Sequence, residues 1–136
     1  MEELKQLFVD MQFSAVKTHI QSGNVIFQTQ NTDKLKLTKT IEYQLLKTFS
    51  VEIRMVIFAA NELIETIGNA PKGFESEPQK FRYDVWFLLP KITTGEFMSN
   101  VRLREGVDFL QVGKNVIYTA RLTNEINKSY LQKKIF

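Results

Sequence analysis

The chain has 136 residues, of which 43% are hydrophobic and 24% are charged, and its formal net charge is +3. This is the composition of an ordinary globular protein and argues against a disordered chain. The basic residues are scattered except for Lys133-Lys134, so the charge does not indicate a nucleic-acid surface. The absence of cysteine excludes disulfides, thiolate nucleophiles and zinc–thiolate sites, and is compatible with a reducing compartment.

The start of the chain and its apolar runs predict the compartment. Met1-Glu2-Glu3 is acidic where a signal peptide is basic. The longest apolar runs, over 55–60 and 85–89, are far shorter than the ~20 residues that a membrane-spanning helix needs. We therefore expect a cytoplasmic protein with no membrane partner.

The first half of the chain predicts two helices and a strand around a hairpin. Apolar residues at the spacing i, i+3, i+4 and i+7 indicate a helix over 2–11. Thr32 or Asp33 is expected to cap a second helix that runs to about residue 48. Alternation of apolar and charged residues predicts a strand over 51–58. The core stripe of the second helix is expected to be Leu37, Ile41, Leu45 and Phe49.

The hairpin between these helices is predicted from its turn. Glycine at the first central position of a two-residue loop allows the positive φ of a type II′ turn, and Gly23-Asn24 fits that position. In this register Ile20 faces Phe27 and His19 faces Gln28. Since side chains alternate along a strand, we expect a buried face of Val16, Thr18, Ile20, Val25 and Phe27, and an exposed face of Lys17, His19, Gln21, Gln28 and the single large apolar residue Ile26.

The second half of the chain repeats this pattern. Asn61 is expected to cap a short helix through Ile67, and residues 69–80 hold two prolines and a glycine, which is typical of a linker. A strand over 82–89, a helix over 93–101 and a hairpin of 107–112 with 116–121 follow. Asn124 is expected to cap a last helix, with Ile126, Tyr130, Leu131 and Ile135 on its inner side.

The two hairpins resemble each other in sequence, and each lies between two predicted helices. If the strand over 51–58 closes one unit and that over 82–89 opens another, both follow the order βαββαβ of ferredoxin-like proteins. We therefore predict an α+β fold of tandem duplicated ferredoxin-like units, with antiparallel sheets and helices on one face. Residues 1–58 form the first unit without its opening strand, 59–80 a short helix and linker, and 81–136 the second unit without its closing strand. Such open sheet edges favour pairing with another copy of the chain.

The segment Thr18-His19-Ile20-Gln21-Ser22-Gly23-Asn24-Val25-Ile26-Phe27 closely resembles a motif of a bacterial family called domain of unknown function 1697 (DUF1697). The family motif reads Thr-Tyr-Ile-Gln-Ser-Gly-Asn-Val-hydrophobic-Phe. Weaker similarities run from the helix over 2–11 through Asn69-Ala70-Pro71 and Phe87-Leu88 to Val116-Ile117-Tyr118. The resemblance covers nearly the whole chain and implies an uncharacterised bacterial protein.

The sequence departs from the family pattern in three places. His19 stands where the family has tyrosine, which puts an aromatic or hydroxyl role there in doubt. An opening strand with an Arg-Gly-Ile-Asn-Val-Gly-Gly loop, and a closing Thr-x-Arg-Asn-Trp-like segment, are usual in the family and are not found in this sequence. The resemblance therefore implies a chain shortened at both ends, which would lack part of any site built from them.

No group of residues specifies a reaction. Ser22 and His19 are three residues apart in a strand, so their side chains are expected on opposite faces and do not form a nucleophile and base. With one histidine and no cysteine, a metal site would need oxygen ligands, yet neither an Asp-x-Asp-x-Asp-Gly loop nor a glycine-rich phosphate loop occurs. We assign no catalytic residue and no metal ligand, and the sequence does not identify a cofactor.

Two functional classes remain open. The first is a non-catalytic module that binds a small molecule, a nucleotide or a nucleic-acid strand, with Thr18, His19, Gln21, Ser22, Gly23 and Asn24 as ligand-binding residues. Nucleic acid is the less favoured ligand, because single-strand binders use exposed aromatic side chains and the candidates are few: His19, Phe109 and Tyr118. The second is an enzyme of unspecified reaction with a site between the two units, drawing on Ser22, Asn24, Arg54 or Asp84. A third explanation involves no site at all: Ser22 and Asn24 are then present only because such side chains hydrogen-bond to the neighbouring backbone in turns.

Overall fold

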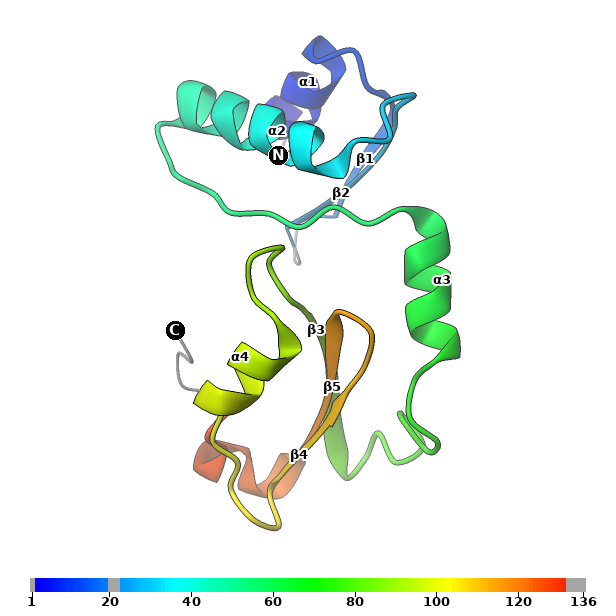
Figure 1. Ribbon diagram of the computed structural model, residues 1–136, viewed down its shortest axis with the longest axis vertical. Coiled ribbons are helices and arrows are strands. Elements are labelled where there is room, and N and C mark those ends of the chain that lie inside the picture. The colour runs from blue at the N-terminus through cyan, green and yellow to red at the C-terminus, as the bar shows by residue number, and fades with distance from the viewer. Residues whose placement is uncertain (1, 20–22, 132–136) are drawn as a thin grey trace. The chain divides into compact units, whose positions relative to one another are not determined.

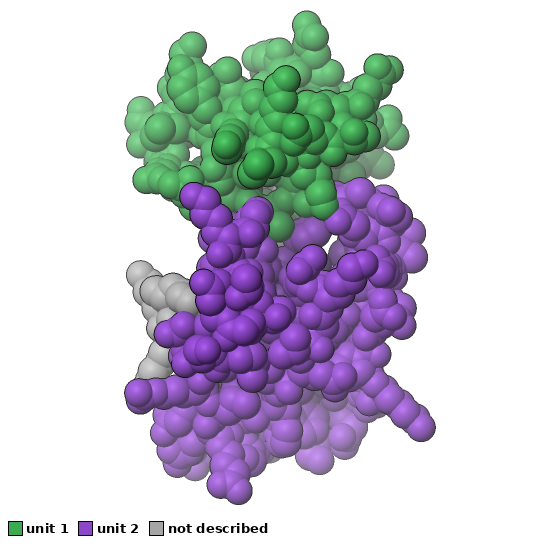
Figure 2. Space-filling view, viewed as in Figure 1, with its two compact units in different colours: residues 1–57 green, residues 58–136 purple. Residues whose placement is uncertain are grey.

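The computed structural model describes residues 2–19 and 23–131 (Figure 1). The chain divides into two compact units, Met1–Ile57 and Phe58–Phe136, coloured separately in Figure 2. Each unit combines helices with an antiparallel sheet, so the predicted α+β class is confirmed. In the described ranges, no helix combines the length and the apolar character that crossing a bilayer requires.

Unit 1 contains a two-stranded sheet and two helices: α1 (Glu2–Asp10), β1 (Ser14–His19), β2 (Asn24–Gln28) and α2 (Lys34–Phe49). Asp33 caps α2 as predicted, because its Oδ1 accepts a hydrogen bond from the Lys36 amide at 3.0 Å. The predicted stripe of α2 is confirmed, with Phe49 only partly buried. The buried core of the unit consists of Leu7, Phe8, Val16, Ile41 and Leu45.

The predicted register of the first hairpin is wrong. His19 pairs with Asn24, and Thr18 with Val25, so residues 20–23 connect the strands and Asn24 belongs to β2. Longer hairpin connections commonly end on a residue in the left-handed region, and Gly23 has that conformation at φ 65°. The predicted pairing of Ile20 with Phe27 involves Ile20, which lies outside the described residues.

The predicted faces of the hairpin are confirmed for the described residues. Val16 is buried, Thr18, Val25 and Phe27 are partly buried, and Lys17, His19, Ile26 and Gln28 are exposed. The faces are preserved because the pairing is displaced by four residues, an even number, and side chains alternate with a period of two.

The predicted strand over 51–58 is also wrong, because these residues pair with no strand. Their alternation has a different cause: Met55 and Ile57 pack against the core of unit 1. The Met55 amide donates a hydrogen bond to Glu42 Oε1 on α2 at 3.0 Å. The amide is therefore satisfied by a side chain instead of by the backbone of a neighbouring strand.

Unit 2 contains a three-stranded antiparallel sheet in the order β3-β5-β4. Its elements are α3 (Ala60–Gly68), β3 (Phe81–Phe87), α4 (Thr94–Asn100), β4 (Asp108–Val112), β5 (Val116–Leu122) and the 3₁₀ helix η1 (Thr123–Lys128). The second hairpin therefore forms as predicted. The last helix is a 3₁₀ helix that starts before Asn124, and Leu131 is buried after it, whereas Ile135 lies outside the described residues.

Two helices contact opposite faces of this sheet. On one face, Trp86 of β3 meets Phe97 of α4, with ring centroids 5.9 Å apart. On the other face, the Tyr118 hydroxyl donates to the Thr66 carbonyl of α3 at 2.5 Å. α3, which the sequence analysis places with the linker, thus touches the face opposite α4 through this hydrogen bond, although none of its residues is buried.

Candidate functional site

The described part of the predicted ligand site lies at the connected end of the β1–β2 hairpin. His19 and Asn24 are directly opposite each other and both are exposed. Gly23 precedes Asn24, and a Cβ placed on this glycine would have no heavy atom within 4 Å. Thr18 is partly buried and lies opposite Val25 on the core-facing side. The structure thus brings together His19, Gly23 and Asn24 and separates Thr18 from them, while Gln21 and Ser22 lie outside the described residues.

The same exposed face carries two further residues that the sequence analysis did not assign to the site. Lys17 lies two residues from His19 on β1 and pairs with Ile26 of β2. Ile26 is 56% exposed, which is high for a large apolar side chain in a strand. We call Lys17, His19, Asn24 and Ile26 the hairpin platform. Alternation along the strands already placed Lys17, His19 and Ile26 on one face, whereas Asn24 was assigned to the turn, and the wrong register concealed its pairing with His19.

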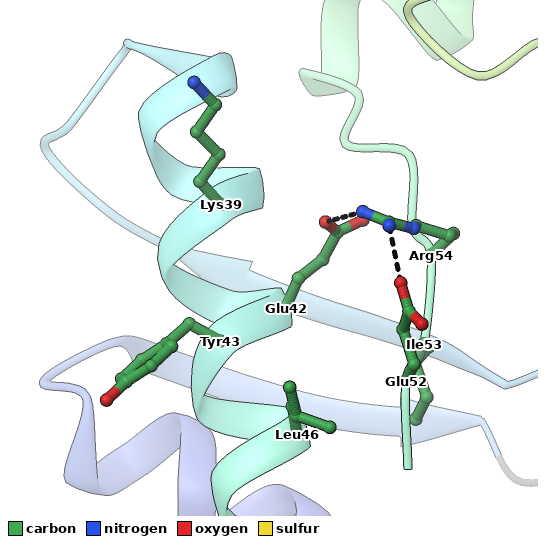
Figure 3. Close-up of a pocket in the computed structure, with 7 residues that line it drawn as sticks. All are labelled: Lys39, Glu42, Tyr43, Leu46, Glu52, Ile53 and Arg54. Atoms are coloured by element: carbon green, nitrogen blue, oxygen red, sulfur yellow. Dashed lines mark hydrogen bonds and ion pairs between the residues drawn. The ribbon is translucent and has the colours of Figure 1, made fainter.

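A shallow pocket of about 200 Å³ lies between α2 and the segment that follows it (Figure 3). Arg54 dominates it: its guanidinium contacts Glu42 Oε2 at 3.3 Å and Glu52 Oε1 at 2.5 Å. Figure 3 shows both carboxylates directed at Arg54, while Lys39 and Tyr43 point away from it. Two carboxylates more than balance the single positive charge of Arg54, and the contact with Glu42 joins the segment to α2, so Arg54 is not a free cation.

Asp84, the other residue named for an enzyme site, is held in an ion pair of unit 2. Its Oδ2 accepts from Arg121 Nη2 at 2.5 Å, and Arg82 Nε lies 3.6 Å from the same oxygen. The Arg121 side chain is 8% exposed and that of Asp84 is 26% exposed. The ion pair joins β3 to β5, so the carboxylate of Asp84 has a structural role in the sheet.

The aromatic residues expected to line the second unit are not equally accessible. Tyr118 is only 3% exposed, and burial raises the pKa of its hydroxyl. Phe109 is exposed and packs edge-on against Phe81, with centroids 5.5 Å apart. Tyr118 therefore has no free ring face for a nucleobase, and Phe109 alone of the two is accessible.

Within the described ranges, no three His, Asp or Glu side chains gather where they would hold a metal ion. Hydrogen bonds from the backbone and then the side chain of Thr93 lower the pKa of Glu96, which completes the N-terminal cap of α4.

The family model described as "Protein of unknown function (DUF1697)" matches residues 1–118. The chain belongs to this family. The DUF1697 chain is also similar to a solved structure described as the conserved bacterial protein SP0830 from Streptococcus pneumoniae, with a TM-score of 0.81 and 17% identity over 98% of this chain and 74% of that one. At this identity the likeness concerns the fold alone. No curated protein gives a significant match.

Proposed function

We propose that this DUF1697 protein is a non-catalytic binding module whose hairpin platform takes a small anionic ligand of the nucleotide class. The observation that carries the proposal is the direct pairing of exposed His19 with exposed Asn24 beside Gly23, with Lys17 on the same face. Gln21 and Ser22, the two predicted site residues outside the described ranges, lie between His19 and Asn24 in the sequence.

The platform offers groups that suit the parts of a nucleotide. The Lys17 ammonium is a point charge for a phosphate, and the His19 imidazole and Asn24 carboxamide supply hydrogen-bonding groups. Ile26 gives an apolar surface for a base. Side chains two apart on a strand are separated by roughly 7 Å, so these groups lie within the length of one nucleotide. Gly23 allows a ligand to approach the backbone closely.

The competing explanation is that these polar residues serve only the turn. Titration calorimetry with AMP and with inorganic phosphate separates the two. If the platform is a site, His19→Ala and Asn24→Ala lose binding while their thermal stability stays close to that of the parent. Gln28→Ala, on the same exposed face at the other end of β2, is the matched control and should bind as the parent does. Failure of the parent protein to bind either probe, with stability losses of about 1 kcal/mol in the variants, would favour the turn explanation.

We also propose that the chain consists of two duplicated ferredoxin-like units. In unit 2, α4 connects β3 to β4 and β5 pairs between these two strands, which supports a ferredoxin-like unit that starts at β3. Unit 1 has the corresponding order of helix, hairpin and helix, which supports the duplication with boundaries 1–58, 59–80 and 81–136. An enzyme site between the units, a nucleic-acid ligand, self-association and a cytoplasmic location stay predictions.

A further inference from the structure

The outer side of α2 gathers lysines that are scattered in the sequence. Ile41 lies in the core at 0% exposure, and a helical period of 3.6 residues places Lys39 and Tyr43, two positions to either side of it, almost opposite it on the helix. Lys36 lies one turn before Lys39, and Lys47 lies one turn after Tyr43, so the four side chains form a row. We call Lys36, Lys39, Tyr43 and Lys47 the α2 face. All four residues are exposed.

The positive charge of the α2 face is not balanced by neighbouring carboxylates. Among the described residues, none forms an ion pair with the three lysines of the face. The single carboxylate of α2 belongs to Glu42, which is 18% exposed and bonds to Arg54 and to the Met55 amide. Lys36 and Lys39 are like charges at i and i+3, and such pairs destabilise a helix. The lysines therefore do not serve the stability of α2, and their charge suits an anionic partner.

Tyr43 adds an accessible aromatic ring at the centre of the α2 face. The residue is 62% exposed and lies at the rim of the shallow pocket, where Figure 3 shows its ring directed away from Arg54. Lys39 and Lys47 stand four residues to either side, roughly 6 Å along the helix axis. Proteins that bind single-stranded nucleic acid combine these two elements, because the ring stacks on a base while cationic side chains contact the phosphates beside it.

The position of the α2 face on the unit separates it from other surfaces. The sheet of unit 1 lies on the core side of α2, where Ile41 packs in one cluster with Val16 of β1. A further strand in that sheet would lie beneath the helix and leave the α2 face uncovered. A helix that binds lipid needs bulky apolar residues on its outermost line, but Leu35 and Leu46, the exposed apolar residues of α2, lie to one side of it. These features favour a nucleic-acid strand over a membrane surface.

We propose that the α2 face binds single-stranded nucleic acid, with one base stacked on the Tyr43 ring and phosphates contacted by the ammonium groups of Lys36, Lys39 and Lys47. The row from Lys36 to Lys47 extends roughly 16 Å along the helix, the length of about five stacked nucleotides at ~3.4 Å each. Because the contacts are to phosphates and to one ring face, binding should be weak, sensitive to salt and independent of base sequence. This inference concerns a surface other than the hairpin platform and does not depend on the ligand proposed there.

Fluorescence anisotropy of a labelled oligothymidylate, titrated with the full chain at several KCl concentrations, tests the phosphate contacts. With three phosphates neutralised, the logarithm of the association constant should fall against the logarithm of salt concentration with a slope of about −2, or ~0.7 per phosphate. Lys39→Ala should weaken binding at low salt and make the slope shallower by about 0.7. Lys91→Ala is the matched control, since it removes the same charge from an exposed position in unit 2 and should bind as the parent does.

Variants of Tyr43 test the stacking. Tyr43→Ala should weaken binding roughly tenfold at every salt concentration without changing the slope, whereas Tyr43→Phe retains the ring and should bind as the parent does. Both positions are on the exposed side of α2, so the Tm of each variant should stay close to that of the parent.

Several results would overturn the proposal. They are a parent chain that binds no oligothymidylate at low salt, equal weakening by Lys39→Ala and Lys91→Ala, and binding that is lost in His19→Ala but kept in the Tyr43 and Lys39 variants, which would place the strand on the hairpin platform. Retention of the chain on phosphatidylserine vesicles without oligothymidylate binding would identify the α2 face as a membrane surface instead.

Discussion

The ion pair between Asp84 and Arg121 predicts a stability effect that also bears on function. Arg121 is nearly fully buried, and its Nη2 lies 2.5 Å from Asp84 Oδ2, so Asp84→Ala leaves a buried guanidinium without that carboxylate. Removal of one partner from a buried ion pair costs about 3–5 kcal/mol. Because Asp84 is 26% exposed and Asp108 lies directly opposite Arg121 on β4, screening and the second carboxylate reduce the expected loss to ~2 kcal/mol.

For a domain of this size ~2 kcal/mol corresponds to a fall in Tm of roughly 10 °C. Calorimetry of Asp84→Ala, Arg121→Met and the double variant completes a thermodynamic cycle. The double variant should be more stable than Asp84→Ala, because it contains no unpaired buried charge. A Tm for Asp84→Ala within about 1 °C of the parent, or strictly additive losses in the double variant, would refute a structural role and return Asp84 to the residues available for chemistry.

Two further predictions concern the core of unit 1 and the cap of α4. Ile41 is 0% exposed, so Ile41→Ala should lower the free energy of urea unfolding by about 3–4 kcal/mol. The exposed control Ile64→Ala should change it by less than ~0.5 kcal/mol. Equal losses in the two variants would contradict the buried position of Ile41 in the core. Hydrogen bonds from Thr93 lower the pKa of Glu96 below its usual value of 4.5. The ionised Glu96 side chain therefore stabilises the folded state at pH values above its unfolded-state pKa. This stabilisation is lost as the pH falls through the lower pKa of the folded state. Glu96→Gln should therefore have a lower Tm than the parent at pH 7 and the same Tm well below pH 4; a difference that persists in acid would contradict the sign of the pKa change.

Local signals predicted helices and faces better than they predicted pairing. Asp33 and the stripe of Leu37, Ile41 and Leu45 lie within α2, where capping and a period of 3.6 act over a few residues. The register of β1 with β2 depends on the length of the connection, and Gly23 fits the end of a longer connection as well as the start of a short one.

Partners distant in the sequence were beyond the reach of these signals. Residues 51–58 alternate as a strand does, but a strand needs a neighbouring edge, and Met55 instead bonds Glu42. In the candidate site, alternation correctly placed His19 on the exposed face, but it did not reveal Asn24 as its partner. Nor could sequence alone show that Arg54 and Asp84 are held in ion pairs.

The most direct test of the binding function is an NMR titration of the isotopically labelled chain with AMP. Amide and side-chain shifts of Lys17, His19, Asn24 and Ile26 should move together with a single Kd, while those of Val112 and Ile64 stay unchanged. Shifts that move elsewhere and leave these four residues unaffected, or no shift at millimolar AMP, would contradict a ligand site on the hairpin platform.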